Sequence, residues 1–358
     1  MTRDYSNFLP NSNKKISSQR PLTILEKLGW QPFFAQQVDI EEIEKTPPVR
    51  ITEIHRNSLH VLGESIDTLI PVGPDATVGD WLLYNSDAPN TSRVLERKSI
   101  FKRRAAGTAW DEQLIAANID TAFIVTSCNQ DFNIARLERY IALALEADVT
   151  PVVILTKSDL SDEVDTYIEQ AQSISRNVSV IALDARREEP QEKLAQWCTP
   201  KQTVVFLGSS GVGKSTLTKA LTRNSDIATQ SIREEDAKGR HTTTSRQLHI
   251  APDGFTIMDT PGMREIQLTD VASGVNDLFS DLLELSFQCK FRDCKHETEP
   301  GCAINAALEN KTIDADRVAR WKKLIAEEEF NSSTLAQRKS KDKALGKLIK
   351  QVKKSGRK

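Results

Sequence analysis

One segment constrains the fold more than any other: residues 203–216, which read TVVFLGSSGVGKST. A short apolar run leads into the pattern G-x-x-x-x-G-K-S, and a helical stretch follows it. This context predicts a buried strand, a loop whose backbone N–H groups hold the α- and β-phosphates of a nucleotide, and a helix. A glycine-rich turn that matches by accident is the alternative, and the flanking strand and helix argue against it.

Within this loop, Lys214 is expected to neutralise the β- and γ-phosphates, which makes it a candidate catalytic residue. The Ser215 hydroxyl is expected to coordinate Mg²⁺. The loop by itself does not distinguish ATP from GTP. The residues predicted to contact the nucleotide here are Gly208, Ser209, Ser210, Gly211, Val212, Gly213, Lys214, Ser215 and Thr216.

Local patterns divide the 358 residues into four parts. Residues 1–37 are polar, with one short helical stretch, and are interpreted as an arm. Short strands separated by turn formers predict a small β-barrel over 38–105. Apolar runs alternate with helical stretches over 106–275, which predicts a buried parallel sheet. Residues 276–358 hold a cluster of Cys and His, charged helices and a basic tail. The predicted fold class is multidomain α/β.

A second nucleotide motif, TKSD, follows the apolar run PVVIL. Guanine presents N1–H and its exocyclic amino group side by side, and the Asp159 carboxylate can accept a hydrogen bond from both. Adenine offers no such pair of donors, so the carboxylate favours guanine. An ordinary loop at the end of a strand is the alternative for so short a match. The residues predicted to contact the base are Thr156, Lys157, Ser158 and Asp159.

Two further segments are typical of switches that respond to the γ-phosphate. In DTPG, Asp259 can hold Mg²⁺ through water, and the Gly262 amide can reach the γ-phosphate. In GRHTTT, Thr243 is the candidate for coordinating Mg²⁺ and assisting catalysis. Met263 stands where many GTPases have a glutamine, and a thioether cannot orient water. His241 is then the nearest candidate for placing the attacking water, although a solvent-facing histidine is an equal alternative.

TKSD precedes the phosphate loop by about fifty residues, whereas most GTPases have the reverse order. A site defined by positions in space tolerates such a permutation when the original termini were neighbours. Together with GDW, ANIDTAFIV, DTPGM and FRDCKHETEPGCAI, the motifs make residues 38–330 resemble the ribosome small subunit-dependent GTPase A family. There are three departures from the family pattern. They are Thr156, where Asn is usual and reaches further, Asp184, where GTPases commonly carry Ser and an ordinary strand end is an equal alternative, and the long polar N-terminal arm.

The resemblance implies an N-terminal OB-fold, a circularly permuted GTPase domain and a C-terminal zinc domain. It also implies slow hydrolysis of GTP to GDP, stimulation by the small (30S) ribosomal subunit, contact with 16S rRNA and a role in late subunit maturation. An RNA-binding assembly module that uses GTP mainly as a structural ligand is the alternative. A signalling or membrane-associated GTPase is a further rival, against which the absence of lipidation signals speaks.

A cluster of metal-ligand residue types follows the GTPase motifs in the pattern C-x4-C-x-H-x5-C. Three thiolates and one imidazole suit a tetrahedral zinc, and four protein ligands leave no open position, so the metal is expected to be structural. Reduced cysteines without metal are the alternative. The predicted ligands are Cys289, Cys294, His296 and Cys302.

Charge and hydropathy complete the expectations about partners. No run approaches the roughly twenty apolar residues of a membrane span, and the start of the chain does not resemble a secretory signal. A cytoplasmic monomer that does not bind membranes is therefore expected. Two basic segments suit contact with RNA phosphates, although both could be solvated faces. They are the tail from Arg338 to Lys358 and the run of Arg97, Lys98, Lys102, Arg103 and Arg104.

Overall fold

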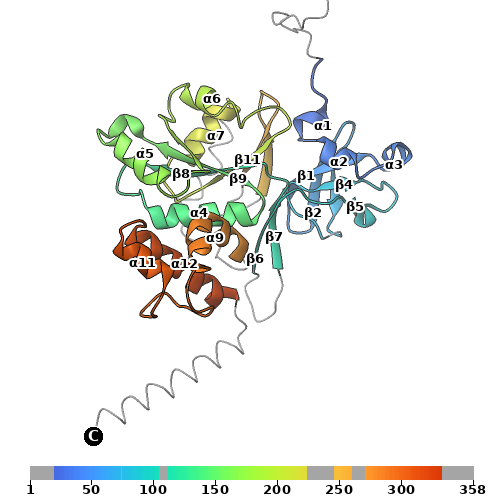
Figure 1. Cartoon of the computed structure of the whole chain (residues 1–358). Coiled ribbons are helices and arrows are strands. Elements are labelled where there is room, and N and C mark those ends of the chain that lie inside the picture. The colour runs from blue at the N-terminus through green and yellow to red at the C-terminus, as the bar shows by residue number, and fades with distance from the viewer. Residues whose placement is uncertain (1–19, 74, 105–111, 224–245, 260–270, 333–358) are drawn as a thin grey trace, which may run out of the picture.

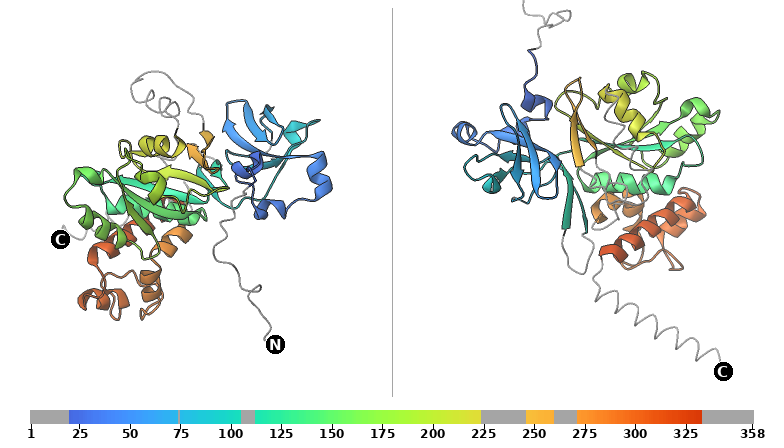
Figure 2. Two further views of the ribbon diagram at one scale, coloured as in Figure 1. Left: turned by 90° about the horizontal axis from the view of Figure 1, so that it is seen from above. Right: turned by 180° about the vertical axis from the view of Figure 1, so that it is seen from behind.

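The computed structural model describes residues 20–73, 75–104, 112–223, 246–259 and 271–332. A small antiparallel β-domain lies beside a larger α/β domain, and a set of helices packs beneath the latter (Figure 1). The view from behind in Figure 2 shows the same three parts. The predicted mixed α/β class is therefore confirmed.

The central sheet holds the strands that the apolar runs predict. Its order is β10-β9-β8-β11-β13-β12, parallel except for the antiparallel pair formed by the last two. Every residue of β8 is buried, as expected of a strand with helices on both faces. The strands are β8 (Thr121–Ser127), β9 (Thr150–Thr156), β10 (Ser179–Ala182), β11 (Thr203–Leu207), β12 (Arg246–Ile250) and β13 (Thr256–Asp259).

Helices cover the two faces of this sheet. Helices α6 (Glu189–Lys193) and α7 (Lys214–Thr222) lie above it in Figure 1, and α4 (Ile134–Glu146) and α9 (Ala272–Leu278) lie below it. Helix α5 (Val164–Gln172) connects β9 to β10. Strands β9, β8 and β11 are parallel neighbours, so the carboxyl ends of β9 and β11 lie at the same end of the sheet. The base-reading and phosphate-binding motifs follow these two ends, although their order along the chain is permuted.

The small β-domain is built from short antiparallel strands around its own core. Strand β1 pairs with β2 and β4, β2 pairs with β3, and β4 pairs with β5. The core consists of Val49, Ile51, Leu59, Val61, Ile70 and Leu82. The elements are β1 (Pro48–Ile54), β2 (Ser58–Gly63), β3 (Asp67–Pro71), β4 (Trp81–Leu83), η2 (Pro89–Thr91) and β5 (Arg93–Val94).

The two β-structures are joined into one sheet. Strand β1 pairs with β12, Glu53 opposite Gln247, and the Gln247 side chain donates a hydrogen bond of 2.7 Å to the Glu53 carboxylate. Nearby, the Arg50 guanidinium is buried and donates to the Asn118 carbonyl at 3.0 Å and the Thr203 hydroxyl at 2.9 Å. Burial lowers the pKa of Arg50 to about 10, which leaves it charged at neutral pH. The small β-domain is therefore a continuation of the central sheet.

The segment before β1 is folded from residue 20 onward, although its polar composition suggested an arm. It forms α1 (Ile24–Lys27), α2 (Pro32–Ala35) and α3 (Ile40–Lys45). Leu28 and Phe34 are buried, and the Trp30 and Trp81 rings lie 4.8 Å apart. A few large apolar residues anchor the segment, and the average polarity of the region conceals them. Residues 1–19 lie outside the described part of the chain.

The C-terminal helices are fixed to α4 and α9. The backbones of α4 and α9 approach so closely that a Cβ on Gly274 would lie 2.0 Å from the Ala142 carbonyl oxygen. The carboxylate of Glu138, fully buried on α4, accepts one bifurcated hydrogen bond from the Arg320 Nε–H, with its two oxygens at 3.0 and 2.9 Å. The helices are α10 (Ser280–Ser286), α11 (Ala303–Glu309) and α12 (Ala315–Ser332), and a hairpin of β6 (Ile100–Arg104) and β7 (Glu112–Ala117) completes the fold.

Candidate functional site

The phosphate loop connects β11 to α7, as its sequence predicts. Gly208 has a φ of 142°, and a Cβ there would lie 2.2 Å from the Val125 carbonyl oxygen, so only glycine fits. Gly213 has a φ of 102° and precedes the first residue of α7. The Lys214 ammonium donates to the carbonyls of Gly208, at 2.8 Å, and of Ser209. These carbonyls hold the lysine at the mouth of the loop, where its charge can meet phosphates.

The base-reading motif is joined directly to this loop. The Thr156 side chain is fully buried, and its hydroxyl lies 2.6 Å from the Val212 carbonyl oxygen and 3.1 Å from the Thr126 carbonyl oxygen. A hydroxyl has one hydrogen, so it donates to one of these carbonyls at a time. Thr156 thus ties β9 to the phosphate loop, which is a positioning role in addition to the guanine contact that its place in the motif predicts.

The three residues after Thr156 leave the sheet toward solvent. Lys157 has a φ of 58°, a left-handed conformation that is uncommon for residues other than glycine. The turn it starts is the 3-10 helix η3 (Ser158–Leu160), on which Asp159 is exposed. Asp159 is therefore an exposed carboxylate just after the carboxyl end of β9, and its role in reading guanine stays a prediction.

Asp184, one of the three departures from the family pattern, forms hydrogen bonds and an ion pair within the protein. Its carboxylate accepts a hydrogen bond of 2.9 Å from the Arg186 backbone N–H and lies 3.3 Å from the Arg187 guanidinium. Its own N–H donates to Glu189. The side chain therefore stabilises the turn that follows β10, which favours the interpretation of this position as an ordinary strand end.

The predicted magnesium and switch residues are only partly described. Asp259 ends β13, which runs parallel to β11, so it lies at the same edge of the sheet as Gly208. Ser215 and Thr216 begin α7. His241, Thr243 and Gly262 lie outside the described residues, and so do Met263 and the basic tail.

The structure adds one residue to the site that the sequence motifs do not indicate. Arg136, on the first turn of α4, donates a hydrogen bond of 2.7 Å to the Ser209 hydroxyl in the phosphate loop. The two residues are 73 positions apart in sequence. Arg136 belongs to none of the nucleotide motifs, so a sequence search based on them cannot find it.

The four predicted zinc ligands converge. Their ligand atoms all lie within 4.8 Å of one another. The Sγ atoms of Cys289 and Cys302 are 3.9 Å apart, and the His296 Nδ1 atom is 3.5 and 3.4 Å from them. Around a tetrahedral zinc, two sulfurs lie roughly 3.8 Å apart, and a sulfur and a nitrogen roughly 3.6 Å. The donor set and its spacing therefore fit zinc.

Surrounding groups hold these ligands in place. The backbone N–H of Ala303 donates to the Cys289 sulfur at 3.3 Å, and that of Asn305 to the Cys302 sulfur at 3.4 Å. The Trp321 ring packs beside the His296 ring at 5.6 Å. Backbone N–H groups, above all that of Lys295, donate hydrogen bonds to the Glu299 carboxylate and lower its pKa to about 2. This carboxylate therefore stays charged and holds the loop between the ligands together. Such support is usual for structural metal centres.

The basic run that follows the small β-domain is partly neutralised. The Arg97 guanidinium lies 2.8 Å from the Asp80 carboxylate, which has no exposed surface. The Lys98 ammonium lies 2.5 Å from Asp120. These two cations serve the fold, so the expectation that the whole run faces RNA is too broad.

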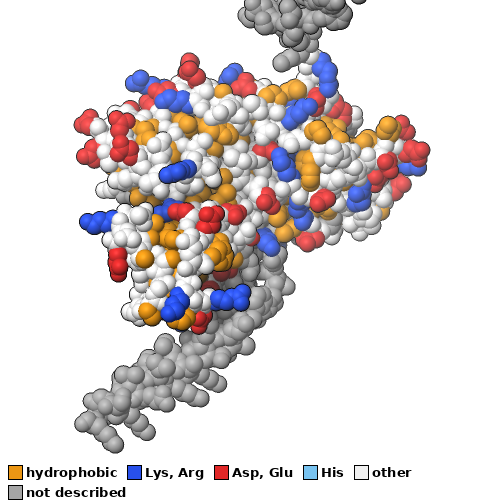
Figure 3. Space-filling view, in the orientation of Figure 1, with side chains coloured by type: hydrophobic (Ala, Val, Ile, Leu, Met, Phe, Trp, Pro, Cys, Tyr) orange, Lys and Arg blue, Asp and Glu red, His pale blue; other side chains and the backbone are white. Residues whose placement is uncertain are grey.

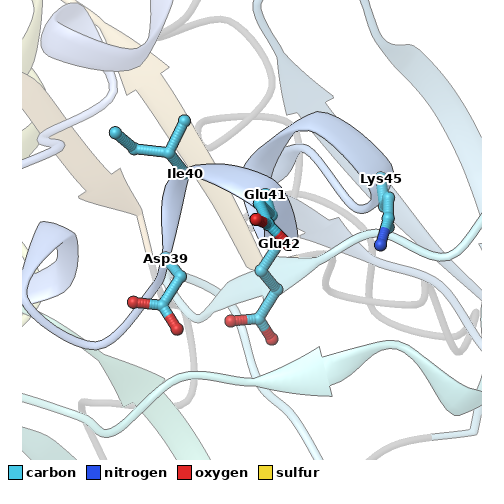
Figure 4. Close-up of a pocket in the computed structure, with 5 residues that line it drawn as sticks. All are labelled: Asp39, Ile40, Glu41, Glu42 and Lys45. Carbon is cyan, nitrogen blue, oxygen red and sulfur yellow. The ribbon is translucent and has the colours of Figure 1, made fainter.

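The opposite end of the small β-domain is acidic. Acidic side chains gather over α3 (Figure 3), and a surface pocket there is lined by Asp39, Ile40, Glu41, Glu42 and Lys45 (Figure 4). Glu42 is paired with Arg93 at 2.9 Å. Carboxylates in this number repel phosphates, so the pocket does not suit a nucleotide or a nucleic acid.

None of the helices within the described ranges is long and apolar enough to cross a membrane.

Comparisons with known proteins agree with this geometry. The family model described as RsgA GTPase matches residues 94–269. Small ribosomal subunit biogenesis GTPase RsgA 2 of Vibrio parahaemolyticus is 46% identical over 340 residues, which cover 94% of this chain and 94% of that protein.

Two solved structures share the fold. YjeQ from Thermotoga maritima is 24% identical with a TM-score of 0.58, and 78% of this chain and 97% of that chain are covered. YloQ, described as a circularly permuted GTPase, is 23% identical with a TM-score of 0.54, and the shares are 83% and 99%. The resemblance drawn from the motifs is confirmed: the chain belongs to the RsgA GTPase family and is a GTP-hydrolysing enzyme.

Proposed function

We propose that this GTPase binds the small (30S) ribosomal subunit, contacts 16S rRNA and assists late maturation, with hydrolysis accelerated on the subunit. The observation that carries the proposal is the similarity to the Vibrio parahaemolyticus protein, named a small ribosomal subunit biogenesis GTPase, over 94% of both chains. Similarity of that extent spans the barrel and the C-terminal helices as well as the nucleotide site. We expect the protein to act as a monomer in the cytoplasm, where subunits are assembled.

The nucleotide site is proposed to hold GTP with Mg²⁺ between the phosphate loop and the base-reading loop. The hydrogen bond between Thr156 and Val212 supports this, because it holds the two loops next to each other. Asp159 is proposed to read guanine, residues 208–216 to hold the phosphates, and Asp259 and Gly262 to respond to the γ-phosphate. Ser215 and Thr243 would coordinate Mg²⁺.

The remaining parts are proposed to contact the subunit. Strands β1–β5 would form an OB-fold, and Cys289, Cys294, His296 and Cys302 would hold one structural zinc that stabilises the C-terminal helices. The paired Arg97 and Lys98 and the acidic surface at α3 favour an orientation in which α3 points away from RNA. The domain limits near residues 38, 105 and 275 remain predictions.

Hydrolysis by the isolated protein is expected to be slow, at roughly 10⁻³ per second or below, because Met263 cannot orient water. We propose that the subunit orders the GRHTTT segment and brings His241 to the attacking water. His241→Ala should then leave GTP affinity unchanged to within about twofold while removing most of the stimulated rate. If His241→Ala keeps the full stimulated rate of the unmutated protein, the attacking water must be positioned by the backbone or by RNA instead.

The experiment that tests the proposed function combines binding and turnover. The protein is sedimented with isolated small subunits in GDP and in a non-hydrolysable GTP analogue, and multiple-turnover phosphate release is measured with and without subunits. Large subunits serve as the control particle. Tighter binding with the analogue and faster release with small subunits only are expected. Binding without stimulated turnover would favour the assembly module that uses GTP as a structural ligand, and no selective binding would refute the proposal.

A further inference from the structure

We propose that Arg136 binds the terminal phosphate of GTP, which makes it an additional catalytic-site residue supplied by α4. The inference rests on the nucleotide site proposed above, and it concerns the GTPase reaction rather than subunit binding. No motif of the phosphate loop, the base-reading loop or the switches includes this residue.

The first observation is the position of the guanidinium. Asn133 caps α4 by accepting a hydrogen bond of 2.9 Å from the Arg136 backbone N–H, which fixes where the side chain starts. The Arg136 Nη1 atom then donates to the Ser209 hydroxyl at 2.7 Å. The side chain is exposed, and among the described residues no carboxylate forms an ion pair with it. Its charge is therefore directed at the phosphate loop and is not neutralised there by an acid.

The second observation is that another cation meets the same loop residue. The Lys214 ammonium donates to the Ser209 carbonyl, and Arg136 donates to the Ser209 hydroxyl. Two positive charges thus converge on one neutral residue. An anion bound beside Ser209 would be attracted by both charges. Lys214 is the residue that neutralises the β- and γ-phosphates, so the shared anion is the end of the triphosphate.

The direction of approach distinguishes the terminal phosphate from the others. Helix α7, whose first turn follows the loop, lies on one face of the sheet, and α4 lies on the opposite face (Figure 1). The α- and β-phosphates are held by the loop amides and the start of α7. Arg136 reaches the start of the loop from the α4 side. Because the α- and β-phosphates are already held, the γ-phosphate is the group left for its guanidinium to bind. Its planar fork can bind two oxygens of one phosphate.

The test uses full-length, zinc-loaded protein without ribosomes, so that failure of the proposed subunit function cannot affect the outcome. Fluorescent GDP and a fluorescent non-hydrolysable GTP analogue are titrated into the unmutated protein and into Arg136→Ala, Arg136→Lys and Ser209→Ala. Arg136→Ala should lose roughly tenfold to hundredfold in affinity for the analogue and less than about threefold for GDP. Arg136→Lys should recover part of the loss, because it keeps the charge without the fork.

Ser209→Ala is the matched control, because it removes the hydroxyl that accepts the same hydrogen bond and keeps Arg136. If Arg136 acts on phosphate, this variant changes the affinities for the analogue and for GDP by the same factor. An equal loss for both nucleotides in Arg136→Ala would show that the arginine only supports the loop, and the proposal would fall. Unchanged affinities for both nucleotides in Arg136→Ala would also refute the proposal. Circular dichroism checks that each variant is folded.

Discussion

Replacing Arg320 by alanine should destabilise the junction between α4 and α12 severely. The Glu138 carboxylate has no exposed surface, and Arg320, itself 21% exposed, is its ion-pair partner. Removing the guanidinium leaves a buried charge uncompensated, which typically costs about 3–5 kcal/mol of unfolding free energy. The double variant Glu138→Leu with Arg320→Met should recover most of that loss, because it buries no charge.

A second ion pair between the same two helices provides the control. Arg139 and Glu327 lie 2.5 Å apart, but their side chains are 36% and 27% exposed. Arg139→Ala removes the same side chain from a solvated pair and should therefore cost less than about 1 kcal/mol. Urea unfolding followed by tryptophan fluorescence measures both variants. A loss in Arg320→Ala no larger than that in Arg139→Ala would refute the argument from burial.

The same pair predicts a pH dependence. Burial raises the pKa of Glu138 above its ordinary value of 4.5, and Arg320 partly opposes that rise. Because the folded state holds the proton more tightly than the unfolded state, this group contributes less stability as the pH rises from 4.5 through the raised value. The loss of unfolding free energy in Arg320→Ala, relative to the unmutated protein, should therefore become smaller toward acidic pH, where Glu138 can be buried in its neutral form. A deficit independent of pH would contradict the assignment of the buried charge.

Three further predictions concern the two sites. Thr156→Val removes the hydroxyl that joins β9 to the phosphate loop, and it should weaken the binding of GTP and of GDP about fivefold each. Titrations that show weaker binding of only one nucleotide would contradict the positioning role. Asp159→Asn should weaken GTP and relax discrimination against other bases, and a preference of the unmutated protein for ATP in competition assays would disprove the assignment. Cys294→Ser should abolish the zinc found by metal analysis and lower the unfolding temperature; full zinc content in that variant would exclude Cys294 as a ligand.

The elements that carry local patterns could be predicted from the sequence. The phosphate loop, the base-reading loop at the end of β9 and the four converging Cys and His residues each depend on neighbours within a few positions. The pairing of Arg136 with Ser209 depends instead on how α4 crosses the sheet. For the same reason, the sequence shows Arg97 and Lys98 as a basic run, whereas the fold places Asp80 and Asp120 against them. In the segment after residue 20, a few apolar residues such as Leu28 and Phe34 stand among many polar neighbours, and only the fold shows that they are buried.

The pairing of β1 with β12 has a consequence for dissecting the protein. Cutting the chain between the small β-domain and the GTPase part would leave β12 as an open strand edge, and such edges promote aggregation. The cut would also remove Arg50, which donates hydrogen bonds to Asn118, shortly before β8, and to Thr203, the first residue of β11. Hydrogen exchange should therefore show the two β-structures opening together as one cooperative unit. Truncated versions would report on a damaged sheet rather than on an independent enzyme.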